Sequence, residues 1–185
     1  MPRYPTRAWR SFEPSATLVR LAPVANLRIL GIDPGSRRTG FGVIDCHGPD
    51  SIHCTHGCIN AGGASLAERV RVIFEGVREL INLHRPQEVA VEQVFVSRNA
   101  ASALKLGQAR GAVLSALPTG LPVFEYAPRA IKLAVVGVGG AEKRQVAHMI
   151  RALLRLDGRI APDAADALAI ALCHAQSRRL RELMK

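Results

Sequence analysis

The sequence predicts an α/β domain built around one five-stranded mixed sheet that is flanked by helices. Short apolar runs of strand length alternate with longer segments that have helical spacing. The first three strand-like runs follow one another through short turns, whereas the later two are separated by helices, as in a mixed sheet. A chain of 185 residues that is 48% hydrophobic is large enough for one domain with a sizeable core.

The first three strands are expected to form an antiparallel meander. Residues 27–33 are a compact apolar run that ends at the turn Pro34-Gly35-Ser36. Residues 39–45 are its expected antiparallel neighbour, and residues 51–60 alternate sufficiently to form the third strand.

The remaining elements are mostly helical. Apolar residues recur at helical spacing over residues 66–81, and Pro86 stops that helix. The later elements are a strand at 88–93, a helix at 100–117 that ends at Pro118, a strand at 122–127, a helical segment from about 129, a glycine-rich break at 137–140, a helix through Val146, Ile150 and Leu153, and a last helix from 162 to about 179.

Residues 1–26 differ from the rest of the chain. They carry four arginines against one acid, and prolines interrupt any amphipathic helix. We interpret them as a disordered basic N-terminal extension, or as the product of a start codon upstream of a native start near Val24 or Leu27. Residues 27–179 then form the domain, and residues 180–185 form a short tail.

The charge of the chain indicates a polyanionic partner. Lys and Arg outnumber Asp and Glu by 25 to 15, which gives a net charge of +10 and favours nucleic acid. No apolar run approaches the roughly 20 residues that span a bilayer. Four cysteines do not make the dense disulfide framework of small secreted domains, so we expect a cytoplasmic protein.

Four carboxylates occupy positions where an α/β domain builds sites. Asp33 ends the first strand, and Glu92 closes an apolar strand where an unpaired carboxylate is unfavourable. Asp163 and Asp166 lie three residues apart at the start of the last helix. Each acid alone has a structural explanation, such as a turn or a helix dipole. If the first and fourth strands are neighbours and the last helix crosses their common end, all four meet.

Four carboxylates in one place would repel one another strongly without a cation. Hard oxygen ligands select Mg²⁺ or Mn²⁺ over zinc, and two such ions about 4 Å apart are the usual clamp for attack of water on a phosphodiester. The sequence therefore predicts a two-metal nuclease site formed by Asp33, Glu92, Asp163 and Asp166.

Motifs along the chain resemble those of one nuclease family. GIDPGSRRTGFGVI, VEQVF, ALKLGQARG, PVFEYA, VVGVGGAEK and DAADALAIA occur in the order of the motifs of the RuvC family of Holliday-junction resolvases, from about residue 27 to 175. The resemblance implies a ribonuclease H-like fold and a homodimer. It also implies paired symmetric nicks across a four-way DNA junction with two Mg²⁺ ions, or Mn²⁺ in their place, and cooperation with the branch-migration complex RuvA-RuvB. The four acids fall on the catalytic positions of the family.

The same resemblance assigns DNA contacts. Phe95 corresponds to the aromatic residue that the family places against unstacked bases, and Lys132 and Lys143 correspond to basic residues near the scissile phosphate. We interpret residues 137–140 as a flexible loop beside the DNA. Further basic residues that we assign to the same DNA-binding surface are Arg37, Arg38, Arg98, Lys105 and Arg110.

Several alternatives remain open at this point. The stripe of small residues along residues 100–114 packs either against its own sheet or against a second copy. On a regular strand Cys54, His56 and Cys58 would share a face, but zinc is disfavoured because no C-x₂-C spacing is present. The rival functions are an actin-like or sugar-kinase ATPase, which needs two such domains, a small ribonuclease H-like RNA-processing nuclease, and a non-enzymatic junction-binding protein whose acids are structural.

Overall fold

The computed structural model describes residues 26–62, 65–93 and 100–184. Its sheet has five strands in the order β3-β2-β1-β4-β5, which confirms the predicted mixed sheet. The first three strands pair antiparallel, whereas β4 runs parallel to both β1 and β5. The strands are β1 (Leu27–Asp33), β2 (Arg38–His47), β3 (Asp50–Asn60), β4 (Glu88–Glu92) and β5 (Val123–Tyr126).

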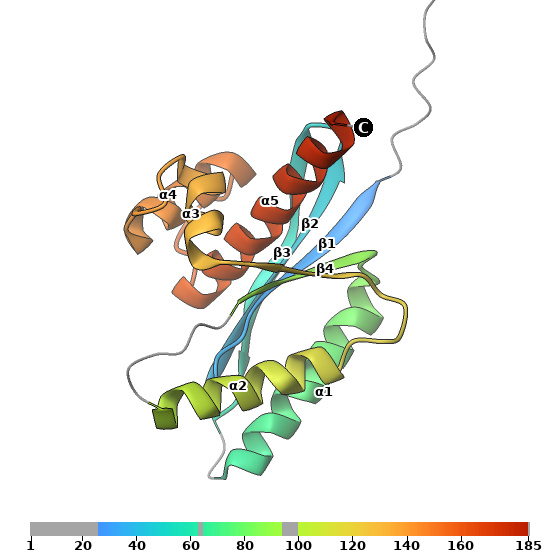
Figure 1. Ribbon diagram of the computed structural model, residues 1–185, viewed down its shortest axis with the longest axis vertical. Helices are drawn as coiled ribbons and strands as arrows, with labels where there is room; N and C mark the ends of the chain where they lie inside the picture. Colours follow the sequence, from blue (N-terminus) through green and yellow to red (C-terminus); the bar gives the residue numbers. More distant parts are fainter. Residues whose placement is uncertain (1–25, 63–64, 94–99, 185) are drawn as a thin grey trace, which may run out of the picture.

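Helices cover both faces of the sheet (Figure 1). One face carries α1 (Leu66–His84) and α2 (Ala100–Ser115), and the opposite face carries α3 (Pro128–Val136), α4 (Lys143–Leu154) and α5 (Pro162–Leu183). All five helices were predicted, and where bounds were predicted they lie within a few residues of the observed ones. In the described part of the chain, none of them has the length and apolar character to cross a membrane.

The predicted end of the last helix at about residue 179 is four residues too early. Arg178 pairs with Glu182 one turn later, at 2.6 Å between Nη1 and Oε1. The guanidinium of Arg181 lies 5.1 Å from the ring centroid of Phe124 on β5. These contacts continue the helix through Leu183, so most of the segment predicted as a tail is helical.

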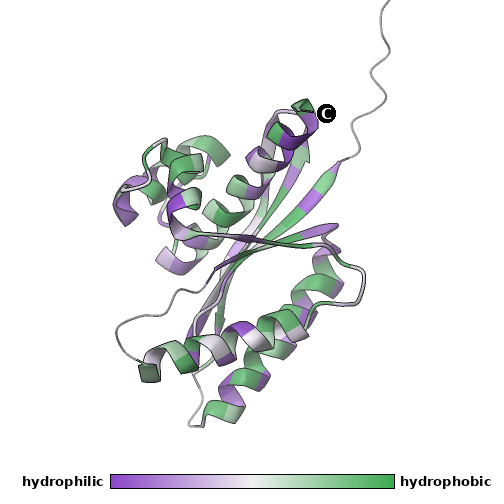
Figure 2. Ribbon diagram, viewed as in Figure 1, coloured by the Kyte–Doolittle hydropathy of each residue, from purple (hydrophilic) through white to green (hydrophobic). Residues whose placement is uncertain are grey.

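Alternation along β1 divides the side chains between two cores. Ile29 packs in the core beneath α5, whereas Leu30 and Ile32 pack in the core beneath α1 and α2. Figure 2 shows hydrophobic and hydrophilic residues alternating along α1, as expected of a helix with one buried face. By the same alternation, Gly31 and Asp33 lie on the face that α5 covers.

Two glycines allow α5 to lie directly on the sheet. A Cβ atom added to Gly31 would lie 2.2 Å from the carbonyl oxygen of Ala167, and one added to Gly40 would lie 1.9 Å from that of Asp163. No side chain fits at such distances, because the opposing atoms belong to the backbone of a helix. The first turns of α5 are therefore held over the ends of β1 and β2.

A buried hydrogen-bond chain fixes the middle of α5 to β4 and β5. The fully buried ring of His174 has Nδ1 at 2.7 Å from the Tyr126 hydroxyl and Nε2 at 2.6 Å from Oε2 of Glu88. Burial lowers the pKa of His174, so the neutral ring donates from Nε2 to Glu88 and accepts from Tyr126 at Nδ1. Arg178 donates to the second Glu88 oxygen at 3.2 Å. Contacts in the second half of α5, far from its first turn, thus fix the position of the helix relative to β4 and β5.

Candidate active site

The four predicted carboxylates lie at one end of the sheet. Asp33 is the last residue of β1, and its partner in register on β2 is Gly40. Glu92 is the last residue of the neighbouring strand β4. Asp163 and Asp166 are in the first turns of α5, whose backbone contacts Gly40. The expectation that the first and fourth strands are neighbours is confirmed.

Strand alternation places Asp33 and Glu92 on the same face. Asp33 is two residues after Gly31, which contacts α5, and Glu92 is two residues after Ala90, which belongs to the core beneath α5. Both carboxylates therefore project toward the helix that carries Asp163 and Asp166.

Burial and neighbouring acids favour the protonated form of Asp33. Burial, followed by the charges of Glu92 and Asp166, raises the pKa of Asp33 to about 8. Burial and the charge of Asp166 also raise the pKa of Glu92, and a hydrogen bond with Asp33 partly opposes that rise. Without a cation, Asp33 and Glu92 therefore share a proton in the hydrogen bond between their carboxyl groups.

Two basic side chains neutralise the acids of the helix. Nζ of Lys143, the first residue of α4, lies 2.9 Å from Oδ2 of Asp166, and Nε of Arg38 lies 3.1 Å from Oδ2 of Asp163. The hydrogen bond with Asp166 raises the pKa of Lys143. These pairs divide the four acids into one proton-sharing pair on the strands and two ion-paired acids on the helix.

The donor set fits a hard divalent cation in its chemistry. All four groups are carboxylates, which Mg²⁺ and Mn²⁺ prefer, and a cation would relieve the repulsion that raises the pKa of Asp33. Over the described ranges, no three His, Cys, Asp or Glu side chains are arranged to ligate one ion together. Two of the four carboxylates are ion-paired instead, Asp163 with Arg38 and Asp166 with Lys143.

Two of the predicted DNA-binding residues lie beside the carboxylates. Lys132 on α3 lies close enough to Glu92 for its charge to oppose the rise in the pKa of that acid, and Lys143 contacts Asp166 while its side chain remains 77% exposed. Phe95 and Arg98 lie outside the described residues.

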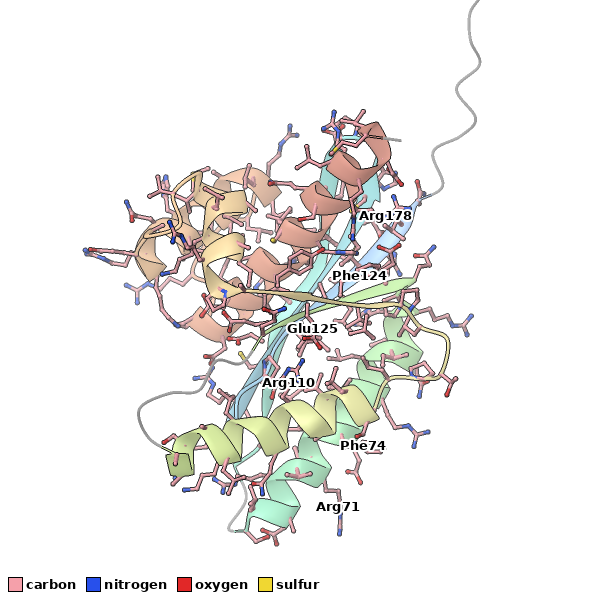
Figure 3. All side chains as sticks on the ribbon, in the orientation of Figure 1. Arg71, Phe74, Arg110, Phe124, Glu125 and Arg178 are labelled. Carbon is pink, nitrogen blue, oxygen red and sulfur yellow. The ribbon has the colours of Figure 1, made fainter. Side chains whose placement is uncertain are left out.

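Two further predicted DNA-binding residues, Lys105 and Arg110, are on α2, across the sheet from the helix that carries Asp163. Lys105 is exposed there. Arg110 forms an ion pair with Glu125 of β5 and is directed at the sheet (Figure 3). Arg110 thus joins α2 to β5, and its proposed contact with DNA stays a prediction.

The cysteine- and histidine-rich strand β3 is irregular. The register between β2 and β3 shifts at Val43 and Ile44, which leaves Cys54 out of the pairing and brings Nε2 of His53 within 2.8 Å of Nδ1 of His56. The expectation that Cys54 shares a face with His56 and Cys58 is therefore wrong, because it assumed a regular strand.

The contact between Arg38 and Asp163 was not predicted from the sequence. From the sequence we assigned Arg38 to the DNA-binding surface together with other basic residues, and we did not expect a contact with Asp163 for Arg38 rather than for Arg37. The available signal was its spacing, since Arg38 precedes Gly40 by two residues and so lies on the face that carries Asp163.

A mixed sheet with acids at the ends of two neighbouring strands and on the helix that crosses them places the protein in the ribonuclease H-like class of nucleases. The chain belongs to the RuvC family, since the family model described as crossover junction endodeoxyribonuclease RuvC matches residues 29–174. The predicted family and fold are thereby confirmed.

Relatives of that name cover most of the chain. The crossover junction endodeoxyribonuclease RuvC of Halorhodospira halophila is 60% identical over 153 residues, which are 82% of this chain and 91% of the relative. That of Chromohalobacter salexigens is 56% identical over 156 residues, 84% of each chain. The structure of T. thermophilus RuvC in complex with a Holliday junction substrate matches with a TM-score of 0.78 and 38% identity, covering 84% of this chain and 96% of that one.

Proposed function

We propose that this protein is a crossover junction endodeoxyribonuclease that acts in DNA recombination and repair. It resolves four-way DNA junctions by paired symmetric nicks in strands of like polarity. The observation that carries the proposal is the meeting of Asp33, Glu92, Asp163 and Asp166 at one end of the sheet in a member of the RuvC family. A solved relative bound to a Holliday junction supports the choice of substrate.

The cofactor that we propose is Mg²⁺, with Mn²⁺ as a substitute and two ions per site. The all-carboxylate donor set and the raised pKa of Asp33 support this choice. Bound divalent cations supply Lewis-acid stabilisation of the phosphodiester oxygens and a readily deprotonated water. The chain itself provides Asp33 and Glu92 on rigid strands, and α5 provides the other two acids.

Basic side chains beside the acids hold the DNA in this scheme. Lys132 and Lys143 contact phosphates near the scissile bond, and their closeness to Glu92 and Asp166 supports this role. Phe95 stacks on an unpaired base at the junction centre. The outer part of the proposed DNA-binding surface consists of Arg98, Lys105 and Arg110.

A homodimer presents two sites to a junction with two equivalent strands. An open face on α2 supports this proposal. Leu104, Gly107 and Gly111 are spaced three and four residues apart, so they share one face of the helix. Leu104 is 65% exposed, and a Cβ added to either glycine would meet no atom of the described residues within 4 Å. Such a face lets a second helix approach closely.

Replacing Gly107 with Arg is expected to convert the dimer to a monomer at micromolar concentration. The bulky charge would occupy the face that a second copy approaches. Because Arg is more favourable than Gly in a helix by about 1 kcal/mol, α2 itself should not be weakened. Light scattering measures the mass, and Gly62→Arg, at another open glycine, is the matched control. A Gly107→Arg protein that stays dimeric would exclude this face.

Family membership also supports cooperation with the branch-migration complex RuvA-RuvB, and the cysteine content supports a cytoplasmic location. Both are part of the proposal.

The function is tested by incubating the protein with synthetic four-way junctions and with linear duplexes, with and without Mg²⁺. We expect paired nicks that are confined to the junction and that require the metal. A protein that binds junctions but cuts none in Mg²⁺ or Mn²⁺ would be an architectural protein, and the proposed function would be wrong.

A further inference from the structure

Arg38 contacts the candidate active site from a half-exposed position. Its Nε lies 3.1 Å from Oδ2 of Asp163, and its Nη2 lies 3.6 Å from Sγ of Cys58 on β3. The Arg38 side chain is 51% exposed, and that of Asp163 is 32% exposed. The guanidinium therefore reaches an acid of the site and solvent at the same time.

The sheet holds this guanidinium in place. Arg38 is the first residue of β2, two residues before Gly40, and Cys58 pairs with Gly40 in register on β3. Because Gly40 has no side chain, the first turn of α5 lies close to the strand, and Arg38 lies between that turn and Cys58. The thiol is a weak acceptor and leaves the charge of the guanidinium available.

Among the described residues, Arg38 has fewer hydrogen-bond partners than it has donors. A guanidinium carries five N–H donors, and the two contacts above engage only part of them. Its fork matches the oxygens of a phosphate, for which arginine is better suited than lysine. An ion pair as exposed as that with Asp163 is weak and can be exchanged for another anion.

We propose that Arg38 is a phosphate-binding residue of the active site that exchanges its partner. It pairs with Asp163 in the free protein and transfers to a DNA phosphate when Asp163 binds a divalent cation. The inference rests on the proposed function, since it assigns Asp163 to the metal and the phosphate to the DNA. The driving force is electrostatic, because a cation at Asp163 removes the attraction that holds the guanidinium there.

The exchange predicts two opposite effects of Arg38→Gln. Without its competitor, Asp163 should bind metal more readily, so the Mg²⁺ concentration for half-saturation should fall by about 2- to 5-fold. Junction binding should weaken by about 3- to 10-fold at low salt, and the slope of its salt dependence should fall by about 1. A residue that only stabilises the fold would not move the two affinities in opposite directions.

The experiment measures both affinities on the full-length protein. Metal binding is followed without DNA, by calorimetric titration with Mg²⁺ and with Mn²⁺. Junction binding is followed by fluorescence anisotropy in Ca²⁺ over a range of salt concentrations, with cleavage checked in the same samples. Arg38→Lys should keep most of the salt slope and lose part of the affinity, since it keeps the charge but not the fork. Arg71→Gln removes the same charge from an exposed position on α1 and is the matched control (Figure 3).

Each contrary outcome has a distinct meaning. If Arg38→Gln leaves both affinities unchanged, or lowers both together, the exchange is wrong while the proposed function stands. If the wild-type protein cuts no junction in Mg²⁺ or Mn²⁺, the proposed function fails, and the inference fails with it.

Discussion

Replacing Asp33 with Asn is expected to abolish junction cleavage while junction binding stays within about twofold of the wild type. Asp33 is the acid that three other carboxylates surround, and the amide keeps its shape but removes the charge that a cation requires. Loss of one ligand of a catalytic metal should lower the cleavage rate by at least about 10³-fold. Single-turnover cleavage of a synthetic junction in Mg²⁺ measures the rate, and anisotropy measures the binding.

The same substitution should stabilise the metal-free protein, and the effect should depend on pH. The pKa of Asp33 is raised from 3.8 to about 8 on folding, so between these values the folded state holds a proton that the unfolded state releases. The free energy of unfolding of the wild type therefore falls as the pH rises through this window. The Asp33→Asn protein carries no such penalty, and at about pH 8.5 its free energy of unfolding should exceed that of the wild type by at least about 1 kcal/mol, or about 2 to 4 °C in Tm.

Addition of Mg²⁺ should make the wild type more stable than the Asp33→Asn protein. The wild type gains stability by binding the ion, and the variant gains less because a ligand is missing. Asp50→Asn, at an exposed site at the opposite end of the sheet, is the control and should change neither cleavage nor the pH profile. An Asp33→Asn protein that cuts at the wild-type rate would leave the metal site without its central ligand, and the proposed mechanism would be wrong.

Local signals account for the parts of the fold that the sequence predicts well. The first strand is predicted with its observed bounds because its apolar run ends at Asp33-Pro34-Gly35. The end of α5 depends partly on Phe124, which is distant in the sequence and contacts Arg181. No local pattern shows that contact, whereas the i,i+4 pair of Arg178 and Glu182 is a local signal for the longer helix that the prediction did not use.

In the candidate site, too, the features with a local sequence signal were predicted and the contacts made by tertiary packing were not. The four acids are predictable, because strand ends and the start of a helix are visible in the sequence and the neighbouring strands bring them together. The ion pairs were not predicted, because each joins two elements that only tertiary packing brings together: β2 and α5 for Arg38 and Asp163, and α4 and α5 for Lys143 and Asp166. Resemblance identified Lys143 as a DNA contact, but not as a partner of Asp166.

The packing of α5 makes Gly31 the position where one added methyl group should do most damage to the fold. A Cβ there would lie 2.2 Å from the Ala167 carbonyl oxygen and 2.8 Å from the Ala171 backbone nitrogen. Neither atom can rotate away, so Gly31→Ala must push the helix off the strand. We expect the free energy of unfolding to fall by about 3 kcal/mol, or about 6 to 12 °C in Tm, as measured by thermal and urea unfolding.

The activity of Gly31→Ala should fall further than its stability explains. Asp163 and Asp166 move with α5, whereas Asp33 and Glu92 stay on their strands, and a displacement of about 1 Å at such a site is worth about 10²-fold in rate. The cleavage rate is therefore compared at a temperature where the variant is still folded. Gly62→Ala adds the same methyl group where no atom of the described part of the chain lies within 4 Å, and it should leave both properties unchanged. Full activity in a folded Gly31→Ala protein would show that the contact between α5 and β1 does not position the acids.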